Sequence, residues 1–152
     1  MIIRRFEPRD RGEYLAMSKE FYASDAVLSP VPSENFEKTF DLLLSGSDYA
    51  DGYLAEEGGK AVAYALLALT WSNEAGGMVV WGEELYVRPE HRGKGFGSAV
   101  IARIFRDYGG KAARFRLETE ETNTGARRLY RRIGFREFPY LQMALDRPGE
   151  TK

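Results

Sequence analysis

Three alternating glycines stand where the chain is expected to turn from a strand into a helix. Residues 92–97 read Arg-Gly-Lys-Gly-Phe-Gly, between the strand-like segment 85–87 and a helical run over residues 98–108. Glycine lets a backbone approach a ligand closely, and the helix that follows points unpaired N–H groups and its positive dipole end at the turn. This pattern predicts a phosphate-binding site, with Arg92 and Lys94 adding positive charge. The alternative is a tight turn with solvated cations, although such a turn needs only one glycine.

The spacing of these glycines excludes two common nucleotide loops. The dinucleotide fingerprint G-x-G-x-x-G requires a third glycine at position 98, which is Ser98. A Walker A loop requires Ser or Thr after Gly-Lys, but Gly95 follows Lys94 and Ala61 follows Lys60. The pattern that remains is Arg-x-x-Gly-x-Gly.

Two adjacent carboxylates, Glu83 and Glu84, precede the loop in an apolar strand. A carboxylate held against apolar neighbours has a raised pKa and is a better base near neutral pH. Both residues are therefore candidates for a general base, and the alternative is a pair of strand-end carboxylates in water. On a regular strand, Glu83 shares a face with Val79, Trp81, Leu85 and Val87, and Glu84 shares one with Met78, Val80 and Tyr86. A β-bulge would exchange these faces.

The loop, the segment 83–89 and a downstream motif together resemble the GNAT superfamily of acyl-CoA-dependent N-acyltransferases. The downstream motif is Asn123-x-x-Ala126-x-x-Leu129-Tyr130-x-x-x-Gly134-Phe135, and the resemblance is strong over about residues 79–135. It implies an N-acetyltransferase that moves an acetyl group from acetyl-CoA to a primary amine, by direct attack in a ternary complex. The acceptor is a small-molecule or a protein amine. The rival function is a non-catalytic acyl-CoA sensor or interaction module.

The resemblance also implies which residues hold acetyl-CoA. The pyrophosphate is expected at the backbone of Gly93, Gly95, Phe96 and Gly97, with Arg92 and Lys94 beside it. The pantetheine arm is expected to pair with the backbone of Leu85, Tyr86 and Val87. Asn123 matches the family residue that hydrogen-bonds this arm, and it can equally be an ordinary helix N-cap.

The resemblance implies that Tyr130 donates a proton to the leaving thiolate. A phenol titrates near pH ~10 and a thiol near ~8.5, so a positioned tyrosine hydroxyl can protonate a developing thiolate. The alternative is a core tyrosine on an apolar helix face. Glu83 is the preferred base, because its spacing to the loop matches the acidic position of polyamine-type family members, and Glu84 remains a candidate.

Composition limits the remaining function classes. The 152 residues carry 22 basic and 23 acidic side chains, a balance that argues against a protein that coats nucleic acid. Arginines 127, 128, 131 and 132 lie opposite the apolar face of their helix; we interpret them as solvated, with some in reach of the CoA 3′-phosphate or a neighbouring subunit. With no cysteine and one histidine, no metal is expected. No membrane segment is expected, and the predicted location is cytoplasmic.

The periodicity predicts an α/β fold with one mixed sheet. Strands are expected over residues 2–6, 52–56, 61–70, 78–87, 113–118 and 140–145, and helices after Asp10, Ser33, Gly97 and Asn123. The first strands form an antiparallel meander, and the helix after the loop makes the strands over 78–87 and 113–118 parallel neighbours that splay to form the acyl-CoA cleft. One domain over residues 1–147 and a tail over 148–152 are expected, and family members often form homodimers.

Overall fold

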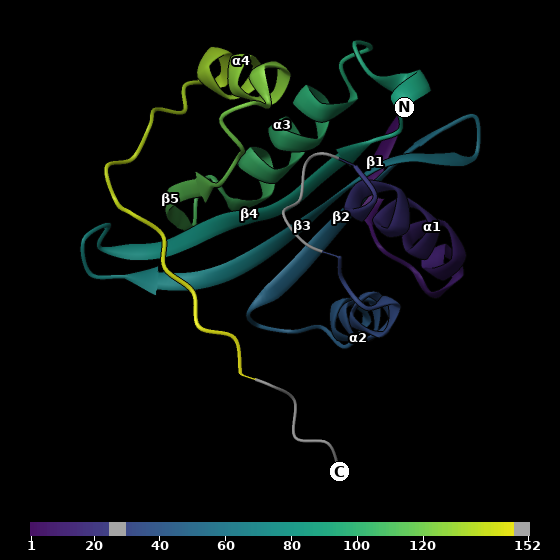
Figure 1. The fold of residues 1–152 in the computed structure, drawn as a ribbon, viewed down its shortest axis with the longest axis horizontal. Coiled ribbons are helices and arrows are strands. Elements are labelled where there is room, and N and C mark those ends of the chain that lie inside the picture. The colour runs from purple at the N-terminus through teal and green to yellow at the C-terminus, as the bar shows by residue number, and fades with distance from the viewer. Residues whose placement is uncertain (25–29, 148–152) are drawn as a thin grey trace.

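The computed structural model describes residues 1–24 and 30–147, in which five strands form one mixed sheet in the order β1-β2-β3-β4-β5. The strands are β1 (Ile2–Arg5), β2 (Ala50–Glu57), β3 (Lys60–Ser72), β4 (Gly77–Val87) and β5 (Ala112–Leu117). The α-helices are α1 (Arg11–Tyr22), α2 (Ser33–Leu44), α3 (Phe96–Tyr108) and α4 (Thr124–Ile133), with short 3-10 turns at Pro8–Asp10 and Pro89–His91. Only β4 and β5 pair in parallel (Figure 1). The predicted fold class is confirmed.

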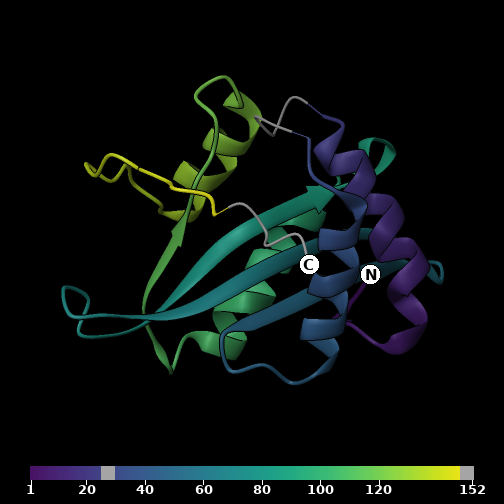
Figure 2. The ribbon, with the colours of Figure 1, turned by 60° about the horizontal axis from the view of Figure 1, so that its bottom comes forward.

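The sheet separates two hydrophobic cores. Helices α1 and α2 cover one face, and α3 and α4 cover the other (Figures 1 and 2). The first core is aromatic, with Tyr14, Phe40 and Tyr64 packed together. In the second core, Val100 and Ile104 of α3 pack against β3 and β4. The helical spacing of these apolar residues is the reason that α3 buries one face against the sheet.

A β-bulge in β4 changes which side chains reach each core. Leu66 of β3 pairs with Glu84, but the next residue, Leu67, pairs with Gly82, so Glu83 is an extra residue without a partner on β3. Before the bulge, Val80 faces α3, and after it Leu85 does so. The alternative raised from the sequence therefore holds: the bulge exchanges the faces of the residues before it, and Val80 no longer shares a face with Glu84. Glu84 lies on the side of α1, together with Tyr86.

The parallel pair separates directly after the bulge. Pairing between β4 and β5 ends at Gly82 and Leu117, whereas β4 continues to Val87. In the described part of the chain, the β5-facing side of residues 85–87 therefore has no strand partner. The crossover through α3 makes these two strands parallel, as the periodicity predicted. The opening between them is the splayed cleft that the sequence indicated.

The closing strand predicted over residues 140–145 is wrong, because residues 134–147 form neither helix nor strand. Leu141, Met143 and Leu145 are 87%, 89% and 91% exposed. Side-chain contacts hold the preceding residues instead: Phe138 lies against the Arg116 guanidinium, and the Tyr140 hydroxyl donates to Glu74 at 2.9 Å. An alternating sequence forms a strand only where a strand edge pairs with it, and here the edge of β5 does not. The predicted tail, 148–152, lies outside the described residues, and the domain limit at residue 147 stays a prediction.

Two predicted helix caps differ in detail. Asp10 precedes α1, but its carboxylate does not cap the helix; it accepts two hydrogen bonds from Arg4, at 2.7 and 2.9 Å. Ser33 is the first residue of α2 rather than its cap, which is Pro32. Asn123 caps α4, since its Oδ1 accepts from the N–H of Ala126 at 3.2 Å, and Gly134 ends α4 with a φ of +112°.

Candidate active site

The glycine loop lies at one end of a groove of about 970 Å³ between β4, α3 and α4. Gly93 and Gly95 have φ values of +74° and +87°, in the left-handed region that glycine adopts without strain. A Cβ on either glycine would meet no atom within 4 Å. The loop therefore leaves open space next to the first turn of α3, whose leading N–H groups lack partners within the helix.

Most residues predicted to hold the donor line this groove. They are Leu85, Tyr86, Val87, Arg92, Gly93, Gly95, Phe96, Gly97, Asn123 and Tyr130. Lys94 is exposed and does not line it, so its contact with phosphate stays a prediction. The Nε of Arg92 donates to the carbonyl of Val87 at 3.0 Å, an arrangement that the sequence did not predict.

Two arginines of α4 also line the groove, and sequence reasoning left them open. Arg128 and Arg132 lie one turn apart on α4, and Arg132 also approaches the Ser98 hydroxyl at 3.4 Å. Their spacing of four residues is the signal that could have found them. Arg127 and Arg131, by contrast, turn toward Glu137 at 2.7 and 2.5 Å. The groove thus presents helix N–H groups, glycine backbone and arginines, a set that fits an anionic pyrophosphate.

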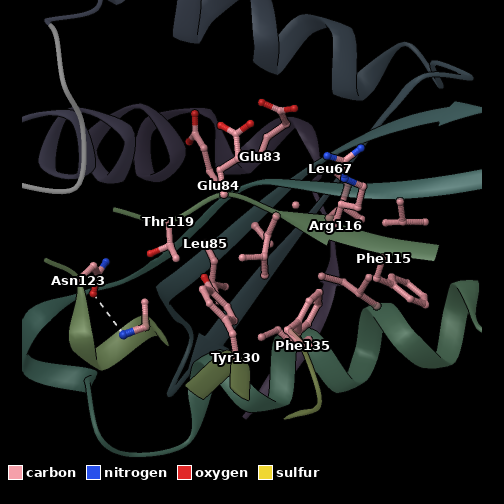
Figure 3. Close-up of a pocket in the computed structure, with 18 of the residues that line it drawn as sticks. Leu67, Glu83, Glu84, Leu85, Phe115, Arg116, Thr119, Asn123, Tyr130 and Phe135 are labelled. Carbon is pink, nitrogen blue, oxygen red and sulfur yellow. Dashed lines mark hydrogen bonds between the residues drawn. The ribbon is translucent and has the colours of Figure 1, made fainter. Parts of the chain in front are cut away.

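A second cavity, of about 130 Å³, adjoins the groove where β4 and β5 separate. Phe21, Leu85, Asn123, Ala126 and Tyr130 line both spaces. Glu83 and Glu84 lie at one end of the cavity, and Tyr130 and Phe135 lie at the other (Figure 3). Glu118 and Glu120 also line it, so four carboxylates gather here.

The two adjacent carboxylates have different surroundings. Both oxygens of Glu84 accept hydrogen bonds, from the Tyr22 hydroxyl at 2.5 Å and the Tyr64 hydroxyl at 2.6 Å. Burial raises the pKa of the Glu84 carboxyl, although these two hydrogen bonds oppose the rise. Glu83 is the bulge residue and has no hydrogen-bond partner among the described residues. Partial burial raises its pKa, and the charges of Glu118 and Glu84 raise it further.

Tyr130 is half-buried on α4 and faces the meeting point of groove and cavity. Its ring lies edge to face with Phe135, at 5.9 Å between centroids, so Phe135 folds back onto α4. Burial raises the pKa of the Tyr130 phenol. Its hydroxyl has no hydrogen-bond partner in the described part of the chain, and it is therefore protonated and available as a donor near neutral pH.

The described residues contain neither a metal-binding cluster nor a membrane-spanning helix. Within residues 1–24 and 30–147, no group of three His, Asp or Glu side chains is arranged to hold a metal ion. No described helix is both long and apolar enough to span a membrane.

The fold and the site define a class: a mixed α/β protein in which a groove that fits an anionic ligand meets a cavity lined by carboxylates. The model of the acetyltransferase (GNAT) family matches residues 15–135. An uncharacterised N-acetyltransferase of Methanocaldococcus jannaschii is 31% identical over 140 residues, which are 90% of this chain and 79% of the relative. The thialysine N-epsilon-acetyltransferase of Sus scrofa is 34% identical over 84 residues, 53% of this chain and 48% of that protein.

A solved structure shares the fold of this chain. The structure of AAC(6')-Iy in complex with the bisubstrate analogue CoA-S-monomethyl-acetylneamine superposes with a TM-score of 0.80 at 18% identity, covering 97% of this chain and 98% of that one. The chain belongs to the acetyltransferase (GNAT) family, and it is an N-acetyltransferase that transfers an acetyl group from acetyl-CoA to an amine.

Proposed function

We propose that Glu83 is the general base and Tyr130 the general acid of this acetyl transfer, in a ternary complex. The observation that carries the proposal is that a carboxylate and a phenol, each without a hydrogen-bond partner for its side chain among the described residues, line one cavity at the opening between β4 and β5. The amine must lose a proton to attack, and Glu83, with its raised pKa, can accept it directly or through water. The leaving thiolate must gain a proton, and the Tyr130 hydroxyl can donate it.

Glu84 is assigned a positioning role instead of the base. Because two phenols already occupy its two oxygens, proton transfer to Glu84 would weaken both hydrogen bonds. Its charge also adds to the rise in the pKa of Glu83. Glu84 thereby tunes its neighbour while it fastens α1 and β3 to β4.

The donor is proposed to lie in the groove. When bound, acetyl-CoA supplies the thioester that the amine attacks. The loop backbone and Arg92 would hold the pyrophosphate, with Arg128 and Arg132 adding charge. The backbone of residues 85–87, which lies beyond the end of the pairing with β5, would hold the pantetheine amides. Asn123, which caps α4 and lines the groove, would contact the same arm through its remaining amide hydrogens.

The acceptor is proposed to be a cationic amine, from either a small molecule or a protein. Four carboxylates around the cavity attract an ammonium group, and the net charge of the chain is only −1, so the attraction is local. A relative named for thialysine acetylation and a structural neighbour named for aminoglycoside acetylation support an amine acceptor. Homodimer formation remains a proposal as well.

Calorimetric titration with acetyl-CoA, followed by an assay of thiol release with diamines, aminoglycosides and peptide amines, tests the function. Saturable binding with amine-dependent thiol release is expected. Binding without release across the whole panel would favour the sensor function over transfer. Absence of binding would remove the assignment of the groove.

A further inference from the structure

The inner end of the cavity beside Tyr130 is apolar. Away from the carboxylates, side chains of β3, β4, β5 and α3 form its walls, together with one residue that follows α4. These residues are Leu67, Val80, Ile101, Phe105, Phe115 and Phe135. Phe115 and Phe135 lie with Tyr130 and Leu85 around this space (Figure 3).

The cavity as a whole, which is partly open, is larger than the voids that protein packing normally leaves. Interiors are packed about as densely as organic crystals, and few voids exceed the size of a water molecule. A cavity of about 150 Å³ lined by Leu, Ile and Phe side chains holds a benzene molecule in another protein. The cavity here, of about 130 Å³ including its carboxylate end, therefore has room for an aliphatic group of a few carbons.

The charge distribution decides which substrate enters the apolar end. The amine is cationic in water, so it is drawn to the end with Glu83, Glu84, Glu118 and Glu120. The acyl chain of the donor carries no charge and loses nothing by leaving water. Tyr130 lines both groove and cavity, so a thioester whose sulfur meets its hydroxyl has its acyl chain beside the apolar wall.

We propose that the enzyme uses acyl donors longer than acetyl-CoA, with propionyl-CoA and butyryl-CoA bound more tightly than acetyl-CoA. The proposal rests on the donor groove described under the proposed function. The reaction is the same for each donor. A bond forms between the amine nitrogen and the acyl carbon, and the carbon–sulfur bond breaks. The amine proton passes to Glu83, and the thiolate receives one from Tyr130.

Calorimetry of acetyl-, propionyl- and butyryl-CoA in the absence of amine tests this proposal by binding alone. Each methylene buried against the apolar wall is expected to lower Kd by roughly four-fold, and thiol release with the best amine is expected to follow the same order. Tighter binding from acetyl to butyryl supports the proposal. Acetyl-CoA that binds as well as butyryl-CoA, or better, overturns it and leaves the donor groove intact, whereas absence of binding by all three overturns the groove itself.

Two neighbouring leucines of β3 provide matched variants. Leu67 lines the cavity, and Leu66 is equally buried on the opposite face of the sheet, outside it. Leu67→Ala enlarges the apolar end and is expected to move the tightest donor to a longer chain, such as hexanoyl-CoA. Leu66→Ala removes the same atoms from the other core and should leave the ratio of butyryl to acetyl Kd unchanged. Equal ratios in the two variants would overturn the proposal.

A variant that fills part of the cavity should shift the donor preference in the opposite direction. Ala65 lines the cavity, and Ala65→Val places two more carbons there. The advantage of butyryl-CoA over acetyl-CoA is expected to shrink or reverse, while acetyl-CoA still binds. Thermal unfolding of the variant without ligand establishes that it is folded at the temperature of the titration. A retained butyryl advantage in the folded variant would contradict the assigned position of the acyl chain.

Discussion

Two identical residues that are adjacent in the sequence have different chemistry in this molecule. Glu84 is held by two phenols, whereas Glu83 faces the cavity without a partner. The bulge, rather than the residue type, causes this difference, because it gives Glu83 no pairing position on β3. The different surroundings of the two carboxylates therefore follow from backbone geometry.

Tyr130→Phe is expected to keep the affinity for acetyl-CoA and to lower kcat by about 10²-fold or more, because it removes the proposed general acid. Calorimetry and steady-state thiol release measure the two effects. Tyr140→Phe is the matched control, since its hydroxyl contacts Glu74 outside both groove and cavity. Wild-type turnover by Tyr130→Phe would make Tyr130 a packing residue.

Glu83→Gln is expected to lower kcat by about 10²-fold and to remove a limb of its pH profile. The base must be deprotonated, and its pKa is raised, so wild-type kcat at saturating substrates should fall as the pH drops through that raised value. Steady-state assays of thiol release between about pH 5 and about pH 9 measure the pH profile of kcat. Glu84→Gln should keep the acidic limb, and an unchanged limb in Glu83→Gln would exclude Glu83 as the base.

At the scale of elements, the junction of the glycine loop and α3 joins the fold to the anion site. Gly95→Val is expected to abolish most of the acetyl-CoA affinity, because the side chain projects into the groove. The positive φ of +87° also strains any residue other than glycine there, by about 1–2 kcal/mol.

A matched variant separates strain from obstruction. Gly58 has a φ of +57° in the β2–β3 turn, where a Cβ likewise meets no atom within 4 Å. Gly58→Val should therefore lose similar stability in urea unfolding and retain full affinity in calorimetry. If both variants lost the same affinity for acetyl-CoA, the effect of Gly95→Val would be explained by backbone strain and not by obstruction of the groove.

Glu84 joins three elements and makes stability depend on pH. Its carboxyl has a higher pKa in the folded chain than its ordinary value of 4.5, so folding favours the protonated form. The contribution of this protonated carboxyl to the stability of the fold is complete below pH 4.5, and it is lost as the pH rises through the raised pKa. Relative to Glu84→Gln, the free energy of unfolding of the wild type should fall across this pH range. The fall should be about 1.4 kcal/mol for each unit by which folding raises the pKa of Glu84. Urea unfolding across this range measures the difference, and Glu90→Gln, at an exposed position, controls for charge. A difference that does not change with pH would contradict the prediction.

At the scale of the whole molecule, arginines gather along the groove and carboxylates around the cavity, although Arg116 also lines the cavity and the net charge is only −1. Arg92, Arg128 and Arg132 line the groove, and Glu118 and Glu120 line the cavity with the two strand carboxylates. An anionic donor and a cationic acceptor are thereby drawn to opposite ends of one continuous space.

This separation predicts a salt effect on the acceptor. The KM of a diamine should rise several-fold between about 0.02 and about 0.2 M salt, because screening weakens its attraction to the carboxylates. A monoamine should respond less, and the double variant Glu118→Gln with Glu120→Gln should flatten the response of the diamine. Steady-state assays at saturating acetyl-CoA measure it. Equal salt slopes for the diamine and the monoamine would contradict a role for the cluster.

The glycine loop, the helices and the parallel strand pair of this molecule could be predicted from sequence, whereas the bulge and the absence of a closing strand could not. Glycines before an apolar helix specify the loop, and helical periodicity places Tyr130 on α4. A bulge leaves no mark in the alternation of β4, because two residues opposing one is a property of the pair of strands. For the same reason, residues 140–145 alternate as a strand should but remain exposed, since pairing depends on a distant edge.

The bulge puts the proposed base where the fold depends on it little. Among the described residues, Glu83 has no ladder partner on β3 or β5 and no side-chain hydrogen bond, so replacing it should disturb little of what holds the fold together. Its side chain nevertheless lines the cavity. Substitution here can therefore change the proposed chemistry with little loss of stability, whereas neighbouring Glu84 is constrained by two phenols and two packed elements.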